Sequence, residues 1–179
     1  MHGRGMRRRR TILIVSAAAA AIAAAVTLVV VWLGDWPAYH FSVVREGILY
    51  RGGQPTGQAL EHIIARYKIK TVVNVRGSYP QQDWWQVERD TCRKHGLRMV
   101  DVPVGSHDTV VSGLKQFLAI ATDSANAPVY VHCEAGSART GYAVAAYRIV
   151  AQGWSYDQAI QEATKFRFNP RVKLNDEWK

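Results

Sequence analysis

Residues 129–141 place the tightest limit on how this chain can fold. The apolar run Val129-Tyr130-Val131 follows Pro128 and is typical of a buried strand. A loop of small residues comes next, and an apolar helix is expected over residues 139–152, ended by Gly153. Such a strand and helix can both be buried only where the helix covers the sheet, so this stretch favours an α/β fold.

The same alternation runs through the rest of the domain. Further strands are expected at residues 48–50, 71–75 and 97–102, and further helices after Thr56, over 82–95, over 112–123 and after Ser155. Strands that alternate with helices predict a central, mostly parallel sheet flanked by helices. We assign the domain to residues 48–170.

The N-terminal part has a different character. A basic tail over residues 1–10 precedes an uncharged run over residues 11–33, which would span about 34 Å as a helix. We expect an uncleaved transmembrane anchor, with the tail in the cytoplasm by the positive-inside rule and the domain outside it, periplasmic in a bacterium. A cleaved signal peptide and secretion are the alternative, which the bulky end of the run disfavours. Residues 34–47 are expected to form a linker, and residues 171–179 a C-terminal tail.

Charge and cysteine content exclude several classes of protein. The net charge is +9, but five arginines of the tail account for much of it, and the remainder has a net charge of only +4. No basic–aromatic pattern or zinc-ligand spacing is present, so a nucleic-acid partner is not expected. Two cysteines, Cys92 and Cys133, are too few for a disulfide framework.

The loop after residue 132 carries the chemistry. Cys133 and Arg139 are separated by the five expected substrate-binding residues Glu134, Ala135, Gly136, Ser137 and Ala138. The backbone N–H groups of such a loop can surround a tetrahedral anion, and the start of a helix favours both that anion and a thiolate. Arg139 can grip two phosphate oxygens, and Thr140 can donate a hydrogen bond to the sulfur.

Residues 132–141 resemble the signature loop of the protein tyrosine phosphatase superfamily, His-Cys-x5-Arg-Ser/Thr. Residues 46–168 resemble its compact dual-specificity-like branch, since residues 50–55 and 71–76 are similar to the Tyr-Arg-Ser-Gly-Gln-Pro and Ile-Asn-Leu-Arg segments of bacterial members. Gly52 replaces the usual Ser, which we interpret as a minor departure. The resemblance implies the cysteine-dependent phosphatase fold, a phosphocysteine intermediate, and no metal or cofactor.

The same resemblance implies a general acid, usually an Asp on a nearby loop. Asp108 is expected in a loop just before a helix, where it could also serve as an N-cap. Asp101 falls inside a strand pattern, where a side chain is more often fixed. We therefore favour Asp108.

Several other residues are ambiguous. Arg76 could line the pocket or form a surface ion pair, and Arg51 is a weaker candidate for the same role. His132 could tune the thiol or simply pack. Trp84 and Trp85 could wall an aromatic pocket, although one core and one surface residue is the commoner outcome.

Glu134 and Cys92 bear on substrate and regulation. An acidic side chain at the mouth of the loop repels polyanions, which argues against inositol phosphates and phospholipids. Cys92 could form a disulfide with Cys133 under oxidation, but a buried free thiol is the preferred interpretation.

The sequence therefore predicts a membrane-anchored phosphatase that acts on phosphotyrosine, phosphoserine or phosphothreonine proteins. A phosphate-binding module without turnover is one alternative. A phosphatase of a small-molecule, glycan or inositol phosphate is another.

Overall fold

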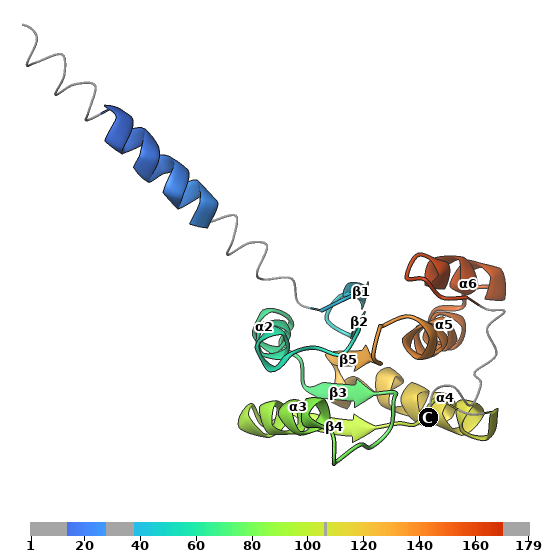
Figure 1. The fold of residues 1–179 in the computed structure, drawn as a ribbon. Coiled ribbons are helices and arrows are strands. Elements are labelled where there is room, and N and C mark those ends of the chain that lie inside the picture. The colour runs from blue at the N-terminus through green and yellow to red at the C-terminus, as the bar shows by residue number, and fades with distance from the viewer. Residues whose placement is uncertain (1–13, 28–37, 106, 170–179) are drawn as a thin grey trace, which may run out of the picture. The chain divides into compact units, whose positions relative to one another are not determined.

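The computed structural model describes residues 14–27, 38–105 and 107–169 (Figure 1). The chain divides into two units, residues 1–36 and 37–179. The second unit contains the sheet and all of the helices that cover it.

In the first unit, the described residues 14–27 form a single helix. No helix of the described residues is both long and apolar enough to cross a membrane. The transmembrane segment expected over residues 11–33 is therefore not confirmed, because 14 helical residues extend only about 21 Å. The remainder of that segment and the basic tail lie outside the described residues, as does the predicted tail over residues 171–179.

The sheet has five strands in the order β1-β2-β5-β3-β4, and the last four are mutually parallel. The strands are β1 (Ser42–Arg45), β2 (Leu49–Gly52), β3 (Thr71–Asn74), β4 (Arg98–Asp101) and β5 (Val129–His132). The prediction of a mostly parallel sheet is confirmed. Since β5 lies between β2 and β3, the loop that follows it starts at the centre of the sheet.

Strand β1 was not expected, because residues 42–45 fall in the predicted linker. It pairs antiparallel with β2 at the edge of the sheet, and its register shifts between Val43 and Arg45. Only Val44 of this strand is buried. A four-residue strand with one inward side chain carries too little periodicity to be recognised from the sequence.

One face of the sheet is covered by α2 (Gly57–Tyr67) and α3 (Asp83–Lys94) (Figure 1). The Thr56 side chain caps α2, as expected, by accepting a hydrogen bond from the Ala59 N–H at 3.2 Å. The buried cluster on this face includes Tyr50, Leu60, Ile63, Val72, Cys92 and Tyr130.

The other face is covered by α4 (His107–Thr122) and α5 (Ala138–Gln152), and α6 (Tyr156–Thr164) packs against α5. A short 3₁₀ turn, η1 (Ser124–Asn126), follows α4. The buried cluster on this face includes Val73, Phe117, Val131, Cys133, Ala143 and Tyr147. Helix α4 begins five residues earlier than its apolar pattern suggests, so Asp108 lies in its first turn and not in a loop.

Candidate active site

Cys133 and Arg139 stand where the sequence places them. Cys133 follows the last residue of β5, at the carboxyl edge of the sheet where open α/β folds bind ligands. Arg139 is the second residue of α5. Each residue is 5% exposed, so the nucleophile candidate and its cationic partner are both largely shielded from solvent.

The carbonyl groups of the loop are tied to segments far away in the sequence. Three consecutive carbonyl oxygens accept hydrogen bonds: Glu134 O from the Gln54 backbone N–H at 2.8 Å, Ala135 O from His40 Nδ1 at 2.8 Å, and Gly136 O from Arg51 Nη2 at 2.5 Å. The N–H of a planar trans peptide points opposite to its C=O. The N–H groups of residues 135–137 therefore point away from these partners, toward the inside of the loop, an arrangement that favours an anion.

Gly136 is required by both conformation and space. Its φ is +67°, and a Cβ there would lie 2.6 Å from the backbone carbon of Gly52. Gly53 is equally confined, because a Cβ on it would lie 2.8 Å from Glu134 O. The end of β2 and the loop thus approach closely enough to form the carbonyl contacts above.

Gly52 is more than the minor departure that the sequence suggested. A Cβ at this position would lie 2.3 Å from the Tyr130 hydroxyl oxygen. That hydroxyl donates a hydrogen bond to Gly53 O at 2.8 Å. The large side chain on β5 and the missing side chain on β2 fit each other.

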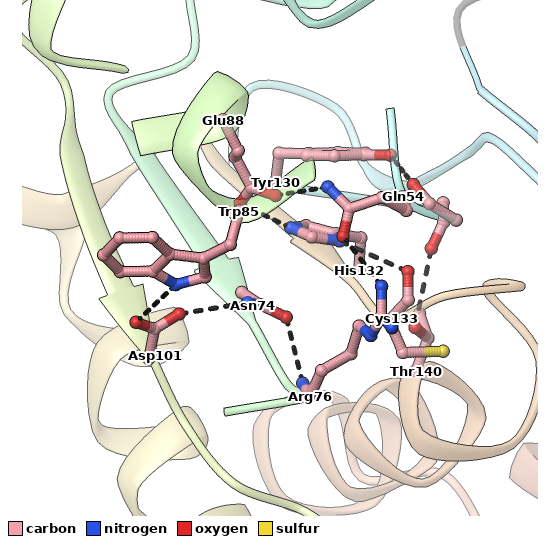
Figure 2. Close-up of polar contacts among 12 residues, drawn as sticks. Gln54, Asn74, Arg76, Trp85, Glu88, Asp101, Tyr130, His132, Cys133 and Thr140 are labelled. Atoms are coloured by element: carbon pink, nitrogen blue, oxygen red, sulfur yellow. Dashed lines mark hydrogen bonds and ion pairs between the residues drawn. The ribbon is translucent and has the colours of Figure 1, made fainter. Parts of the chain in front are cut away.

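A buried acidic residue supports the histidine that precedes Cys133. His132 Nε2 lies 2.8 Å from Glu88 Oε1, and His132 Nδ1 lies 3.3 Å from Cys133 O. Gln54 Nε2 donates to the other Glu88 oxygen at 2.5 Å, as Figure 2 shows. The sequence did not identify Glu88. Its one signal is an acidic residue four positions before Cys92, on the buried face of α3.

Arg76 lies at the mouth of the loop. Its guanidinium stacks over the Trp84 ring at 3.7 Å, and Nη2 lies 3.4 Å from Glu134 Oε2. Tyr79 packs against Trp84, with 5.6 Å between the ring centroids. The ion-pair interpretation of Arg76 therefore applies, with a partner that belongs to the loop, and a pocket lined by Arg76 stays a prediction. Trp84 and Trp85 are both half-buried, so they are not one core and one surface residue, and an aromatic pocket also stays a prediction.

Asp101 is held on both of its carboxylate oxygens. Asn74 Nδ2 donates to Oδ1 at 3.0 Å and Trp85 Nε1 donates to Oδ2 at 2.9 Å (Figure 2). Burial raises the pKa of Asp101, and these hydrogen bonds act in the opposite direction. The favoured acid, Asp108, begins α4 with a side chain that lies outside the described part of the structure.

Two hydroxyl groups border the start of α5. Ser137 Oγ donates to Phe166 O at 2.8 Å, which ties the loop to the segment after α6. Thr140 is buried, and its Oγ1 lies 3.5 Å from Gly52 O. The hydrogen bond from Thr140 to the Cys133 sulfur stays a prediction.

The two cysteines are both free and belong to buried clusters on opposite faces of the sheet. Burial raises the pKa of Cys92 to about 12. The preferred interpretation of Cys92 as a buried thiol agrees with this placement. Among the described residues, no group of three or more His, Cys, Asp or Glu side chains is placed to hold a metal ion.

A strand-end cysteine, a five-residue loop with inward N–H groups and an arginine at the helix start define the class of cysteine-dependent phosphatase folds. Residues 38–177 match the family model described as "DSP-PTPase phosphatase fused to NAD+ Kinase". The chain belongs to this family, a dual-specificity-like branch of the protein tyrosine phosphatase superfamily.

Individual relatives agree with this assignment. The chain is 31% identical over 132 residues to the dual specificity protein phosphatase TpbA of Pseudomonas aeruginosa, covering 72% of this chain and 55% of the relative. It is 27% identical over 147 residues to the inositol diphosphatase SIW14 of Saccharomyces cerevisiae, covering 79% and 50%. The chain thus spans about half the length of the curated relatives it matches.

Solved structures share the fold. The core catalytic domain of the PP-IP phosphatase SIW14 from S. cerevisiae, in complex with citrate, aligns with a TM-score of 0.64 at 26% identity. The alignment covers 76% of this chain and 80% of that domain. P. aeruginosa TpbA aligns with a TM-score of 0.51 at 30% identity, covering 69% and 72%.

Proposed function

We propose that this protein is a cysteine-dependent phosphatase that hydrolyses phosphate monoesters through a phosphocysteine intermediate. The observation that carries the proposal is the loop of residues 133–139, whose carbonyl groups are held outward so that its N–H groups face inward. Three such N–H groups and one guanidinium match the oxygens of a phosphoryl group.

The chemistry follows from this arrangement. The Cys133 thiolate attacks phosphorus, an S–P bond forms, and the P–O bond to the alcohol or phenol breaks. The leaving oxygen takes a proton from the general acid. Water then attacks the phosphocysteine and gives a proton to the carboxylate left by the first step, the S–P bond breaks, and inorganic phosphate and the thiolate are released. The loop N–H groups and Arg139 stabilise the charge on the transferring group in both steps.

We assign the general acid to Asp108. Asp101 is a poor donor, because both of its oxygens already accept hydrogen bonds from Trp85 and Asn74. Asp108→Asn is expected to slow an aryl phosphate with a poor leaving group at least about tenfold more than one with a good leaving group. Asp101→Asn is the matched control. Equal slowing of both substrates by Asp108→Asn would count against the assignment.

The central test is an assay of the full-length chain with p-nitrophenyl phosphate under reducing conditions, beside Cys133→Ser. Metal-independent, vanadate-sensitive turnover that is lost in the variant would support the mechanism. A folded, reduced protein that binds vanadate without turnover would instead be a phosphate-binding module. Trapping of a phosphorylated Cys133 in the first minutes of turnover would identify the intermediate.

For the substrate, we propose phosphotyrosine, phosphoserine or phosphothreonine in proteins. The relative TpbA is named a protein phosphatase and SIW14 an inositol diphosphatase, so the names of the relatives do not decide between a protein and an inositol phosphate as substrate. The exposed Glu134 carboxylate at the mouth supports a substrate with few negative charges. The expected result is a higher kcat/KM for a phosphotyrosine peptide than for an inositol polyphosphate. In Glu134→Gln, the ratio of these two kcat/KM values should be smaller than in wild type. The reverse ranking would move the assignment to inositol phosphates.

On sequence grounds alone, we also propose that residues 11–33 anchor the protein, with the catalytic domain outside the cytoplasm. The support is the uncharged run and the arginine cluster before it. A C-terminal reporter active only outside the cytoplasm is expected to be active. Release of the mature protein into the soluble fraction would favour the cleaved signal peptide, and activity of only a cytoplasmic reporter would contradict both.

A further inference from the structure

A second arginine lies beneath the loop, fully enclosed. Arg51 extends from β2 and is 1% exposed. Its Nη2 donates to Gly136 O, and its guanidinium lies over the Phe166 ring, 3.8 Å from the ring centroid. Its Nε and Nη1 have no hydrogen-bond partner among the described residues.

Burying an arginine in this way lowers the stability of the folded protein. A buried guanidinium with two N–H-bearing nitrogens left without acceptors loses hydration that one carbonyl and one aromatic ring replace only in part. Burial lowers the pKa of Arg51 to about 10, and the nearby Cys133 sulfur acts in the opposite direction. The group therefore stays charged at neutral pH, and negative charge on Cys133 and on Glu162 favours that charge.

The contact with Gly136 also has a geometric consequence. Because the Gly136–Ser137 peptide is planar, a donor that holds Gly136 O outward holds the Ser137 N–H inward. Ser137 is further tied to Phe166 O, the carbonyl of the residue whose ring lies against Arg51. Arg51 and Phe166 thus support the same peptide group from β2 and from the segment after α6.

We propose that Arg51 is a positioning residue of the phosphate loop, which aims the Ser137 N–H at the bound phosphoryl group and holds a fixed positive charge against the loop that begins at Cys133. This rests on the proposed function, since it assigns Arg51 a part in that same site. Arg51 is enclosed and touches no substrate, so it acts through the loop backbone and through its charge.

Several other ionisable groups border the loop. They are Arg139 of α5, His132 and Tyr130 of β5, Glu88 of α3, Arg76 after β3 and Glu134 within the loop. Glu162 of α6 and Arg148 of α5 also act electrostatically on Arg51. Substitution of Arg51 leaves all of them in place. A change in thiol behaviour can then be assigned to Arg51 if a second buried arginine, removed in the same way, has no such effect.

Arg148 of α5 supplies that matched control. It is also buried, donates to a backbone carbonyl, Val44 O, at 2.8 Å, and lies over an aromatic ring, that of Trp154, at 4.4 Å. It also forms an ion pair with a carboxylate, that of Glu162, which Arg51 does not do among the described residues. Its partners are outside the loop. Arg51→Met and Arg148→Met therefore each remove a buried guanidinium, and Arg148→Met in addition leaves Glu162 without its ion-pair partner.

The experiment uses the full-length protein and measures three quantities: the rate of alkylation of Cys133 by iodoacetamide as a function of pH, the concentration of inorganic phosphate that protects Cys133, and the midpoint of thermal unfolding. In Arg51→Met we expect the half-maximal alkylation rate about one pH unit higher and protection that needs at least about tenfold more phosphate. In Arg51→Lys the charge is kept and the planar fork is lost, so the alkylation profile returns toward wild type while protection stays weak.

In Arg148→Met we expect a lower unfolding midpoint with both Cys133 readouts within about twofold of wild type. The proposal is overturned if Arg51→Met only unfolds earlier, like Arg148→Met, with an unchanged alkylation profile and unchanged protection. If Arg51→Met does not fold, an Arg51→Lys variant with wild-type protection overturns it equally. None of these readouts needs turnover. A wild-type protein without phosphatase activity would therefore contradict the proposed function, but the comparison of Arg51→Met with Arg148→Met could still be made.

Discussion

Cys92 and Cys133 are both buried free thiols in one small domain, yet their surroundings differ in almost every respect. Cys92 lies in the last turn of α3, where it packs among apolar side chains that include those of α2, and burial raises its pKa to about 12. Cys133 sits at a strand end, among inward N–H groups and two arginines. The comparison teaches that low exposure does not make a thiol inert or reactive, because the dipoles and charges around it decide.

The sharpest way to break this comparison is chemical labelling. At pH 7 a thiol with a pKa of about 12 is thiolate in only about one molecule in 10⁵, so iodoacetamide is expected to alkylate Cys133 at least about 10³-fold faster than Cys92. Peptide mass spectrometry of the native protein measures both rates. In urea the two rates should converge, and comparable labelling in the folded state would contradict the contrast.

The next largest effect concerns Arg139, the positively charged residue of the loop. Arg139→Lys keeps a positive charge at the start of α5 but removes the bidentate fork, so kcat/KM for p-nitrophenyl phosphate should fall roughly 10²-fold or more. Steady-state kinetics at a fixed pH measures the loss, and circular dichroism checks the fold. A loss below about threefold would show that charge alone is enough.

Two glycines that flank α5 test the role of backbone geometry. Gly136 and Gly153 have φ values of +67° and +69°, but a Cβ at Gly153 would meet no atom within 4 Å. Both substitutions by Ala cost about 1 kcal/mol of conformational strain. Only Gly136→Ala should also reduce kcat/KM, about tenfold or more, by forcing the loop away from β2. Equal kinetics in the two variants would argue that the close approach is unimportant.

The smallest effect is on stability at high pH. The folded state holds the Cys92 proton above pH 9, where the unfolded chain releases it. The contribution of Cys92 to stability is therefore complete below about pH 9 and declines by at most roughly 1.4 kcal/mol per pH unit as pH rises toward 12. Urea unfolding of wild type and Cys92→Ala at pH 8, 9 and 10 measures the difference. If the stabilities of wild type and Cys92→Ala change in parallel with pH, the pKa of the Cys92 thiol is not raised by burial.

Local patterns predicted the loop of residues 133–139 and most of the helices and strands around it. The spacing of Cys133 and Arg139, the apolar run of β5 and the caps at Thr56 and Ser155 all act within a few residues, and the structure agrees with each. Asp108 was expected in a loop because the apolar face of α4 begins late, although the helix itself begins at His107.

Contacts between distant segments were out of reach of such patterns. His40, Arg51 and Gln54 support loop carbonyls from 80 or more residues away, and none of the three carries a periodic signal. Glu88 was missed for the same reason, since only its partner His132 explains an acid in a buried position. A single sequence reports the secondary structure that a segment prefers. The role of these residues depends instead on the distant residues that they contact.

The tie between His40 and Ala135, and that between Ser137 and Phe166, lead to a practical expectation about trimming this domain. A version shortened to begin at β1, or to end with α6, would keep every strand and helix of the sheet unit. It would nevertheless lose an outer support of the phosphate loop. Expression boundaries chosen from secondary structure alone would thus remove contacts that hold the loop of residues 133–139, and a boundary at the end of α6 would also remove the buried Phe168 side chain that packs against Tyr142.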